Sequence, residues 1–162
     1  MTLKTIDRID LAILRELQAN ARITNAELSR RVNLSPSPCL ERVRRLEEKG
    51  YIRGYHAHLN ARRLKTNLVV FIEISLERTA PGIFADFKAA AARIPEVQEC
   101  HLISGNFDYL IKARVADMDA YRHFLGETIL ALPHVRESRS YVVMETVKET
   151  LNIPLPREPE DG

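Results

Sequence analysis

The chain has 162 residues, of which 45% are hydrophobic and 28% charged, a composition that suits one or two small globular domains and excludes a disordered chain. Its formal charge of +2 hides an asymmetry, because residues 1–65 contain 14 Lys and Arg against 7 Asp and Glu, whereas residues 66–162 contain 10 against 15. No apolar run approaches the roughly 18 residues of a membrane helix, and the charged N-terminus is unlike a signal peptide, so we expect a cytoplasmic protein. The asymmetry indicates a polyanion-binding module attached to a second domain.

Two helices are predicted at the N-terminus. The first begins after Asp7, its expected N-cap, and carries an apolar stripe at helical spacing, formed by Ile9, Ile13, Leu14 and Leu17. The second runs from Thr24 to about Val32, because Thr24 and Glu27 have the spacing of a capping box. A turn at Asn33 follows.

A third helix is predicted to end near Gly50, with Ser35 or Ser37 as its N-cap and prolines in its first turn. Leu40, Val43 and Leu46 recur at a spacing of three and are expected to face the core, which leaves an arginine-rich row on the other faces. A solvated helix face is the ordinary explanation of such a row. The tight turn before it and the charge asymmetry favour a helix-turn-helix that lies on DNA. The residues predicted to contact DNA are Arg30, Ser35, Ser37, Glu41, Arg42, Arg44 and Arg45.

A β-prone stretch, residues 51–59, follows the third helix and completes the pattern of a winged helix-turn-helix. His56 and His58 alternate with apolar residues in it and could in principle bind a metal, but with no third ligand we interpret them as exposed polar positions. Cys39 and Cys100 lack a CxxC spacing, so we expect free thiols and no metal or cofactor.

The second half of the chain contains an internal repeat, since residues 94–99 and 132–137 share the pattern of an apolar residue, Pro, any residue, Val, any residue and Glu. In each half of the repeat a strand leads into an amphipathic helix, and the Pro-x-Val step opens another strand. The predicted strands are 68–77 and 108–115, and the predicted helices are 81–93 and 118–131. Two βαβ units in tandem give an α+β ferredoxin-like βαββαβ fold.

A four-stranded sheet of this fold leaves one face open. Apolar residues on that face would be an aggregation hazard in a monomer, so we expect face-to-face dimerisation. The candidates for the open face are Val69, Phe71, Cys100, Leu102 and Val143.

A short loop, residues 104–109, connects the central strands and contains a glycine, an amide and a carboxylate. A nest-like turn at Gly105 and Asn106 could offer backbone N–H groups to the carboxylate of a free amino acid, and Asp108 could accept its ammonium group. The same sequence is also an ordinary hairpin turn, and the residues alone leave both interpretations open.

Several segments together resemble the Lrp/AsnC transcription regulators, and within them the leucine-responsive branch. The segments are Asp7-Arg8-Ile9-Asp10, the run LSPSPCLERVRRLE over residues 34–47, Gly50-Tyr51-Ile52, Gly105-x-Phe107-Asp108 and Tyr141-Val142-Val143-Met144-Glu145. The Ser-Pro-x-Pro-Cys run is the most specific of them, and the similarity extends over nearly the whole chain.

The resemblance implies a DNA-binding dimer that assembles further, often to an octamer, and that responds to an amino acid bound between subunits. Leucine or another apolar amino acid is the expected effector. The effector residues implied are Leu102, Gly105, Asn106, Phe107, Asp108, Met118, Tyr141 and Val142, with the strand around Tyr141 coming from a neighbouring subunit. Close relatives often have Asp where this chain has Asn106.

The predicted organisation is therefore a DNA-binding domain over residues 1–60, a basic linker over 61–67, an effector-binding and oligomerisation domain over 68–150 and a flexible tail over 151–162. The expected function is a cytoplasmic, nucleoid-associated transcription regulator that binds double-stranded DNA, a free amino acid and other copies of itself. An enzyme is not expected, because no nucleophile, metal site or phosphate loop accompanies Asp108 and His101. The remaining alternative is an amino-acid sensor that acts through protein partners without specific DNA binding.

Overall fold

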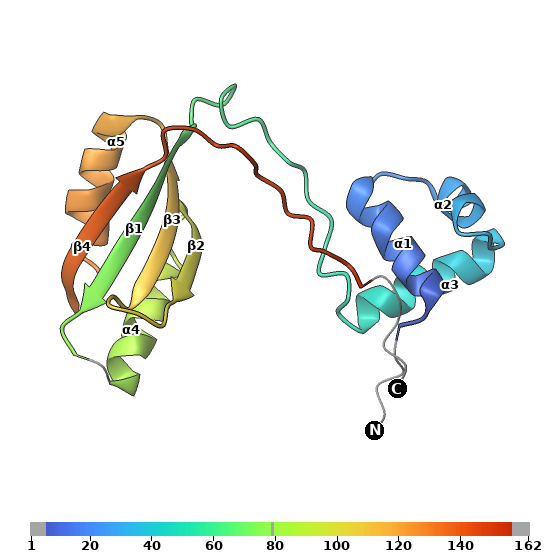
Figure 1. The fold of residues 1–162 in the computed structure, drawn as a ribbon, viewed down its shortest axis with the longest axis horizontal. Coiled ribbons are helices and arrows are strands. Elements are labelled where there is room, and N and C mark those ends of the chain that lie inside the picture. Colours follow the sequence, from blue (N-terminus) through green and yellow to red (C-terminus); the bar gives the residue numbers. More distant parts are fainter. Residues whose placement is uncertain (1–5, 79, 157–162) are drawn as a thin grey trace. The chain divides into compact units, whose positions relative to one another are not determined.

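The computed structural model describes residues 6–78 and 80–156, and the chain divides into two compact units (Figure 1). One unit consists of the chain up to His58 together with the C-terminal segment from Glu149, and the other runs from Leu59 to Lys148. Each unit has its own hydrophobic core.

The N-terminal unit contains three helices, α1 (Arg8–Ala19), α2 (Asn25–Arg31) and α3 (Pro36–Glu48). The predicted cap of α1 is confirmed, because the Asp7 side chain accepts the Asp10 amide at 2.8 Å and the Asp10 side chain accepts the Asp7 amide at 3.3 Å. The helices therefore begin where the sequence places them, and Asn33 adopts a left-handed φ of 53° in the turn that joins α2 to α3.

Two details of the capping differ from prediction. Thr24 accepts the Glu27 amide as expected, but the Glu27 carboxylate bonds Arg30 and Arg31 and does not return to the cap. A charge-assisted bond to a guanidinium is stronger than a bond to a neutral amide, and this explains the choice. Ser35 is the N-cap of α3, but its side chain makes no capping hydrogen bond.

The core of the N-terminal unit comprises Ile13, Leu28, Val32, Cys39 and Leu46. The prediction that Leu40 faces this core is wrong, since Leu40 is 38% exposed and Cys39 is fully buried. A helix turns by about 100° per residue, so a spacing of four then three keeps Cys39, Val43 and Leu46 on one face, whereas two spacings of three drift away from it.

The β-prone stretch over residues 51–59 forms no strand in the structure. A strand needs a partner for its backbone donors and acceptors, and no described segment of this chain pairs with the stretch. Gly54 there has φ of 155°, and a Cβ at this position would lie 2.9 Å from the His56 ring.

The sequence predicts a flexible tail over residues 151–162. Over residues 151–156 it has no regular structure, but its backbone is bonded to α1. The Gln18 amide donates to the Ile153 carbonyl at 2.9 Å and accepts the Ile153 N–H at 3.0 Å, and Arg15 donates to the Pro156 carbonyl at 2.7 Å. The predicted tail over residues 157–162 lies outside the described residues.

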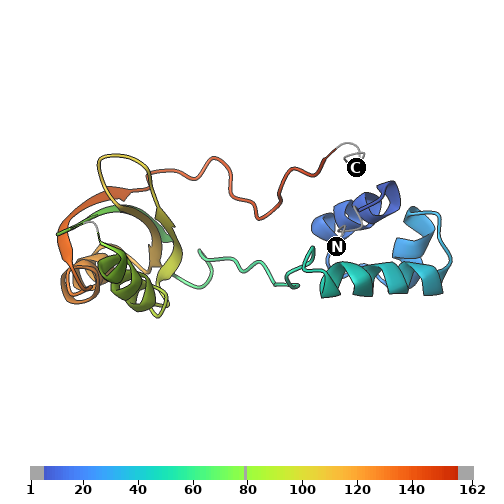
Figure 2. The ribbon, with the colours of Figure 1, turned by 90° about the horizontal axis from the view of Figure 1, so that it is seen from below.

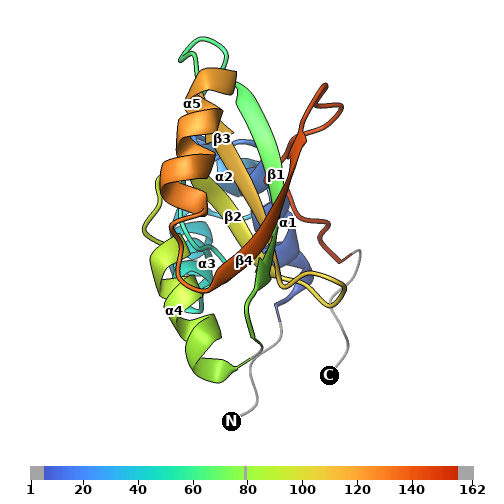
Figure 3. The same cartoon turned by 90° about the vertical axis from the view of Figure 1, so that its left-hand side faces the viewer.

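The second unit is a four-stranded antiparallel sheet with helices on one face (Figures 2 and 3). Its strands are β1 (Leu68–Leu76), β2 (Val97–Leu102), β3 (Tyr109–Val115) and β4 (Val135–Val142), in the order β2-β3-β1-β4. The helices are α4 (Pro81–Ala91) and α5 (Met118–His123), and α5 continues as a π-helix, η1 (Phe124–Ile129). The predicted βαββαβ fold is confirmed, and the π-helical turn was not predicted.

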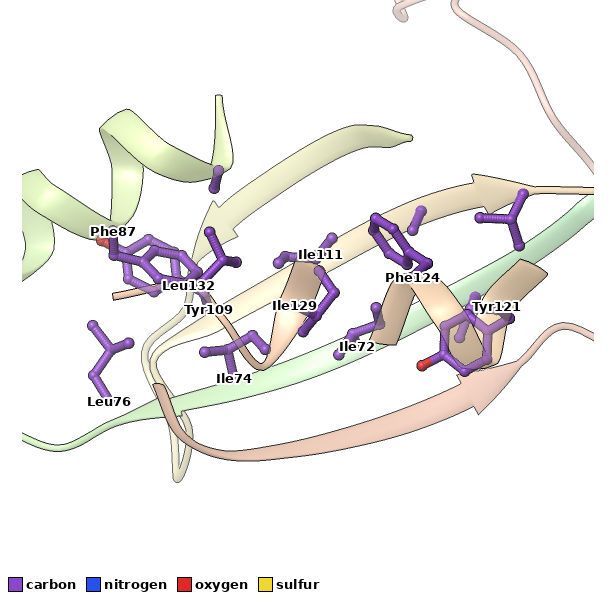
Figure 4. Packing of buried hydrophobic residues seen from close by; sticks show 14 residues of the cluster. Ile72, Ile74, Leu76, Phe87, Tyr109, Ile111, Tyr121, Phe124, Ile129 and Leu132 are labelled. Carbon is purple, nitrogen blue, oxygen red and sulfur yellow. The ribbon is translucent and has the colours of Figure 1, made fainter. Parts of the chain in front are cut away.

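The core of the sheet unit lies between the strands and the helices. Alternate residues of β1 are buried there, namely Val70, Ile72, Ile74 and Leu76, and the helices contribute Phe87, Tyr121, Phe124 and Ile129 (Figure 4). Tyr109 packs against Phe87 with ring centroids 4.5 Å apart. Strand periodicity and core position therefore agree along β1 and β3.

The open face is less apolar than predicted. Val69 and Phe71 lie on it, but Cys100 and Leu102 are opposite Ile111 and Tyr109 and so share the face that the helices cover. The β2–β3 register contains an irregularity between Val97 and Glu99, which shifts the alternation expected for β2 by one position. Val143 follows the end of β4.

Candidate functional site

The solvent-facing side of α3 carries Ser37, Glu41 and Arg44, which are spaced by four and then three residues. Ser37, Glu41 and Arg44 are all exposed and fall on the face opposite Cys39 and Leu46. Arg44 is the arginine of this face. Hydroxyl, carboxylate and guanidinium groups in a row on the second helix of a helix-turn-helix can meet base edges in a major groove.

The other two arginines of α3 turn toward α1. Arg42 donates to Asp7 at 2.6 Å and to Asp10 at 2.9 Å, and Arg45 donates to Asp10 at 2.8 Å. The pKa of Asp7 is lowered: burial raises it, but hydrogen bonds from Arg42 and from the Asp10 amide, together with the Arg42 charge, outweigh that effect. Of the arginines predicted to contact DNA, Arg42 and Arg45 are thus held by carboxylates.

Arg30, the remaining arginine predicted to contact DNA, projects from α2 with a side chain that is 76% exposed. It pairs with Glu27 at 2.7 Å, and the pair is three residues apart on one helix. An ion pair this exposed contributes little to stability, so the arginine can exchange its partner for a phosphate at small cost. Ser35 lies exposed at the start of α3.

The loop between β2 and β3 is tied to the end of β1. The Asp108 amide donates to the Ile74 carbonyl at 2.8 Å, and the Leu76 amide donates to the Asp108 carboxylate at 2.7 Å. None of residues 104–108, all of which the structure describes, has a left-handed φ, so these residues do not form a nest of the αR-αL kind. One oxygen of Asp108 therefore shapes the fold.

A small cavity of about 80 Å³ lies beside this loop. Its lining joins the loop to the ends of β1 and β4 and consists of Glu73, Ser75, Asn106, Phe107, Arg136, Glu137, Ser138 and Arg139. Carboxylates and guanidinium groups together in one hollow suit a zwitterion, which carries both charges. The sequence analysis does not include the β4 arginines, Arg136 and Arg139, among the effector residues. Alternating charged residues in a strand are typical of a solvent-exposed surface.

The predicted effector residues fall into two groups within one chain. Tyr109, next to the loop, is opposite Ile74, whereas Val142 is opposite Val70, which separates the two ends of the sheet by about 13 Å. Leu102 and the loop residues Gly105 to Asp108 belong to the first end, and Met118, Tyr141 and Val142 to the second. A single chain does not bring the two groups together.

A larger hollow of about 470 Å³ adjoins η1 and was not predicted. It is lined by Thr66, Glu96, Arg114, Val115, Ala116, Ala120, His123, Phe124, Glu127 and Thr128. The pattern of residues 118–131 predicts a continuous α-helix, and π-helical turns are rare, so the sequence does not indicate this hollow.

No group of three His, Cys, Asp or Glu that could hold a metal is present within residues 6–78 and 80–156. His101 lies on the open face, where its ring is 3.2 Å from the Glu99 carboxylate, whereas the Asp108 carboxylate accepts the Leu76 amide. Burial raises the pKa of the Cys39 thiol, so this thiol stays protonated near neutral pH. Among the described residues, no helix is long and apolar enough to cross a membrane.

Two family models match the chain. The winged helix-turn-helix DNA-binding model matches residues 6–53, and the Lrp/AsnC ligand binding domain model matches residues 69–153. The chain belongs to the Lrp/AsnC family. The family resemblance predicted from the sequence is thereby confirmed, and the two matched regions are those that fold as the helical unit and the sheet.

Known members of the Lrp/AsnC family are similar over nearly the whole length. The leucine-responsive regulatory protein of Salmonella typhimurium is 60% identical over 147 residues, which cover 91% of this chain and 90% of that protein. A transcriptional regulator from Neisseria meningitidis, solved in complex with L-Met, is 41% identical with a TM-score of 0.87, covering 93% of this chain and 97% of that chain. An AsnC family regulator from Agrobacterium tumefaciens is 34% identical with a TM-score of 0.88, covering 92% of this chain and 97% of that chain. These relatives are regulators, so the prediction that the chain is not an enzyme is confirmed.

Proposed function

We propose that this Lrp/AsnC protein is a sequence-specific DNA-binding regulator whose DNA affinity or assembly changes when an apolar amino acid binds. The observation that carries the DNA half is the exposed row of Ser37, Glu41 and Arg44 on α3. Arg44 is suited to a guanine edge and Glu41 to a cytosine amine, because their donors and acceptors complement those edges. Arg30 and the linker arginines Arg62 and Arg63 supply phosphate contacts.

The effector half rests on exposed apolar side chains at the two ends of the sheet. Leu102 is 60% exposed, Met118 48% and Tyr141 49%. An apolar effector needs such side chains around it, and they converge only if a second copy places its Tyr141 end against the loop of the first. We therefore place the effector site between subunits, with the polar hollow at Asn106 and Arg139 receiving the charged groups of the amino acid.

Leucine is the effector we propose first. The Salmonella relative is called leucine-responsive, and the Neisseria regulator was solved with L-Met. Leucine and methionine both have an apolar side chain, which is branched in leucine and unbranched in methionine. The assembly we propose is a dimer through the open face of the sheet, with octamers as the higher state. Its place in the cell is the cytoplasm, associated with the nucleoid.

The test uses the full chain. Duplexes that the protein selects from a random pool are compared with scrambled duplexes of equal composition, and calorimetric titration is run against each of the twenty amino acids. Selection of one sequence together with a heat of binding for leucine or a similar amino acid supports the proposal. Equal binding to selected and scrambled duplexes at moderate salt would instead favour a sensor that acts through protein partners.

A further inference from the structure

Two carboxylates at the start of α1, those of Asp7 and Asp10, are bonded to α3, the second helix of the helix-turn-helix. Asp10 is the one charged side chain buried among the described residues, at 3% exposure, and it lies within the Asp7 to Asp10 cap of α1. A buried carboxylate is tolerated only when it is paired and hydrogen-bonded. The Asp10 carboxylate must therefore keep its hydrogen-bonding partners in the folded protein.

Asp10 bonds both of the arginines that α3 turns inward. One carboxylate oxygen accepts from Arg42 at 2.9 Å and from Arg45 at 2.9 Å, and the other accepts from Arg45 at 2.8 Å. Asp7 accepts from the same Arg42 nitrogen at 2.6 Å. Two carboxylates thus face two guanidinium groups, and the cluster has no net charge.

We propose that Asp10 is a positioning residue that withholds the charges of Arg42 and Arg45 from DNA phosphates, so that Arg44 is the one arginine of α3 that remains available to DNA. The inference rests on the proposed DNA-binding function. Moving either arginine to a phosphate would remove one of the two guanidinium partners of the buried Asp10 carboxylate. The loss of a charge-assisted bond to a buried carboxylate costs more than one solvated phosphate contact gains.

The consequence is a bias toward sequence reading. Phosphate contacts supply nearly all of the non-specific affinity of a DNA-binding protein, and each adds about 0.9 to the slope of log affinity against log salt concentration. A helix that displayed Arg42, Arg44 and Arg45 together would bind any duplex. Pairing Arg42 and Arg45 with carboxylates lowers the non-specific affinity for DNA. Discrimination between base sequences then depends on the exposed row of α3.

The deciding experiment compares Arg45→Gln with Arg44→Gln in the full chain. Each protein is titrated into a duplex selected by the unaltered protein and into a scrambled duplex, over a range of salt concentrations. We expect Arg44→Gln to lose operator affinity or flatten the slope by about 1, and Arg45→Gln to leave the slope unchanged. Arg42 still pairs with Asp10 in the Arg45→Gln variant, which protects the fold.

A second pair of variants tests the role of Asp10 itself. Asp10→Asn removes the charge and keeps a similar shape, so it should steepen the salt slope on the scrambled duplex by about 1 to 2. Adding Arg45→Gln to Asp10→Asn should recover part of that increase. A carboxylate that only holds the helices together would lower the melting temperature without moving the slope.

The outcomes separate the inference from the proposed function. A slope that falls as much in Arg45→Gln as in Arg44→Gln would overturn the inference, because Asp10 would then be aiming Arg45 at a phosphate. An unchanged salt slope in Asp10→Asn would overturn the inference as well. If Asp10→Asn does not fold, the comparison of Arg45→Gln with Arg44→Gln still tests the inference. Equal affinity of the unaltered protein for both duplexes would contradict the proposed function.

Discussion

At the scale of single residues, partners decide which charges are available for function. Four of the five arginines in α2 and α3 have a carboxylate partner within 3 Å, and Arg44 projects from the solvent-facing row. The same reasoning applies to Asp108, one oxygen of which accepts the Leu76 amide. Residue type and position in a motif indicate a site, and contacts then show which of its members are committed to the fold.

Arg44→Ala is expected to cost about 1 to 3 kcal/mol of operator binding and to relax specificity at one base pair, because a guanidinium bonded to a base edge is lost. Gel shifts with the selected duplex and with its single-base variants measure both effects. Arg22→Ala, which removes an exposed arginine outside α2 and α3, is the matched control. Normal affinity and an unaltered base preference in Arg44→Ala would show that this side chain does not read DNA.

Two substitutions of Asp108 are expected to have different effects on effector affinity and on stability. Asp108→Asn keeps a carbonyl oxygen for the Leu76 amide but removes the charge that we expect to pair with an effector ammonium group, so effector affinity should fall roughly ten- to a hundredfold with little loss of stability. Asp108→Ala also orphans the amide of Leu76, a buried residue, and should cost about 1 to 3 kcal/mol of stability.

Calorimetric titration and thermal melting of both Asp108 variants measure these effects. If Asp108→Asn binds the effector normally, the carboxylate serves the turn alone, and the ammonium group of the effector has another partner.

At the scale of elements, the sequence predicts helices and strands well where periodicity and capping agree. Helix α1 and strands β1 and β3 begin within a residue of their predicted starts. Three segments differ from the prediction. Residues 51–59 lack a partner strand, the side-chain alternation of β2 is shifted by an irregular register, and α5 continues as a π-helix. None of these three depends on side-chain pattern alone. Helical spacing predicts the exposed positions of Ser37, Glu41 and Arg44. It does not predict the ion pairs of Arg42 and Arg45, because these depend on the contact with α1.

The contact between α1 and α3 is expected to weaken in acid. The lowered pKa of Asp7 means that its contribution to stability is fully present above the ordinary value of 3.8 and is lost as pH falls through the lower folded value. Asp7→Asn should therefore be less stable than the unaltered protein near pH 7, by at most about 1 kcal/mol for so exposed a pair, and equally stable in strong acid.

Denaturant melts of the Asp7→Asn variant at a series of pH values check this prediction. A difference in stability that persists unchanged at low pH would show that the Asp7 charge is not its source.

At the scale of the whole molecule, the two units hold different parts of the proposed function and are joined by two segments of chain. The linker leaves the DNA-binding unit after His58, and the chain returns to it at Glu149. The return segment is fastened to α1 by the paired bonds between Gln18 and Ile153. Assembly of several copies through the sheets would place several DNA-binding units along one duplex, an arrangement that raises avidity without new contacts.

Phe71→Lys is expected to disrupt the proposed dimer. Phe71 lies on the open face opposite Lys112 and Tyr141, so a lysine there would bury a second ammonium group in the interface at a cost of several kcal/mol. Sedimentation velocity should show a smaller species. Leu130→Lys, at an exposed position in the helical layer, is the control and should sediment normally. An unchanged oligomer for Phe71→Lys would move the interface away from the open face.

The most direct test of the central claim is the coupling between the effector and DNA. The dissociation constant of a fluorescent operator duplex is measured by anisotropy without and with saturating leucine or the amino acid found by titration, and the affinity for that amino acid is then measured with and without DNA. The claim predicts that the two affinities change by one common factor, on the order of 5 to 150, because linkage is reciprocal. Identical DNA affinity in the presence of each of the twenty amino acids would contradict it.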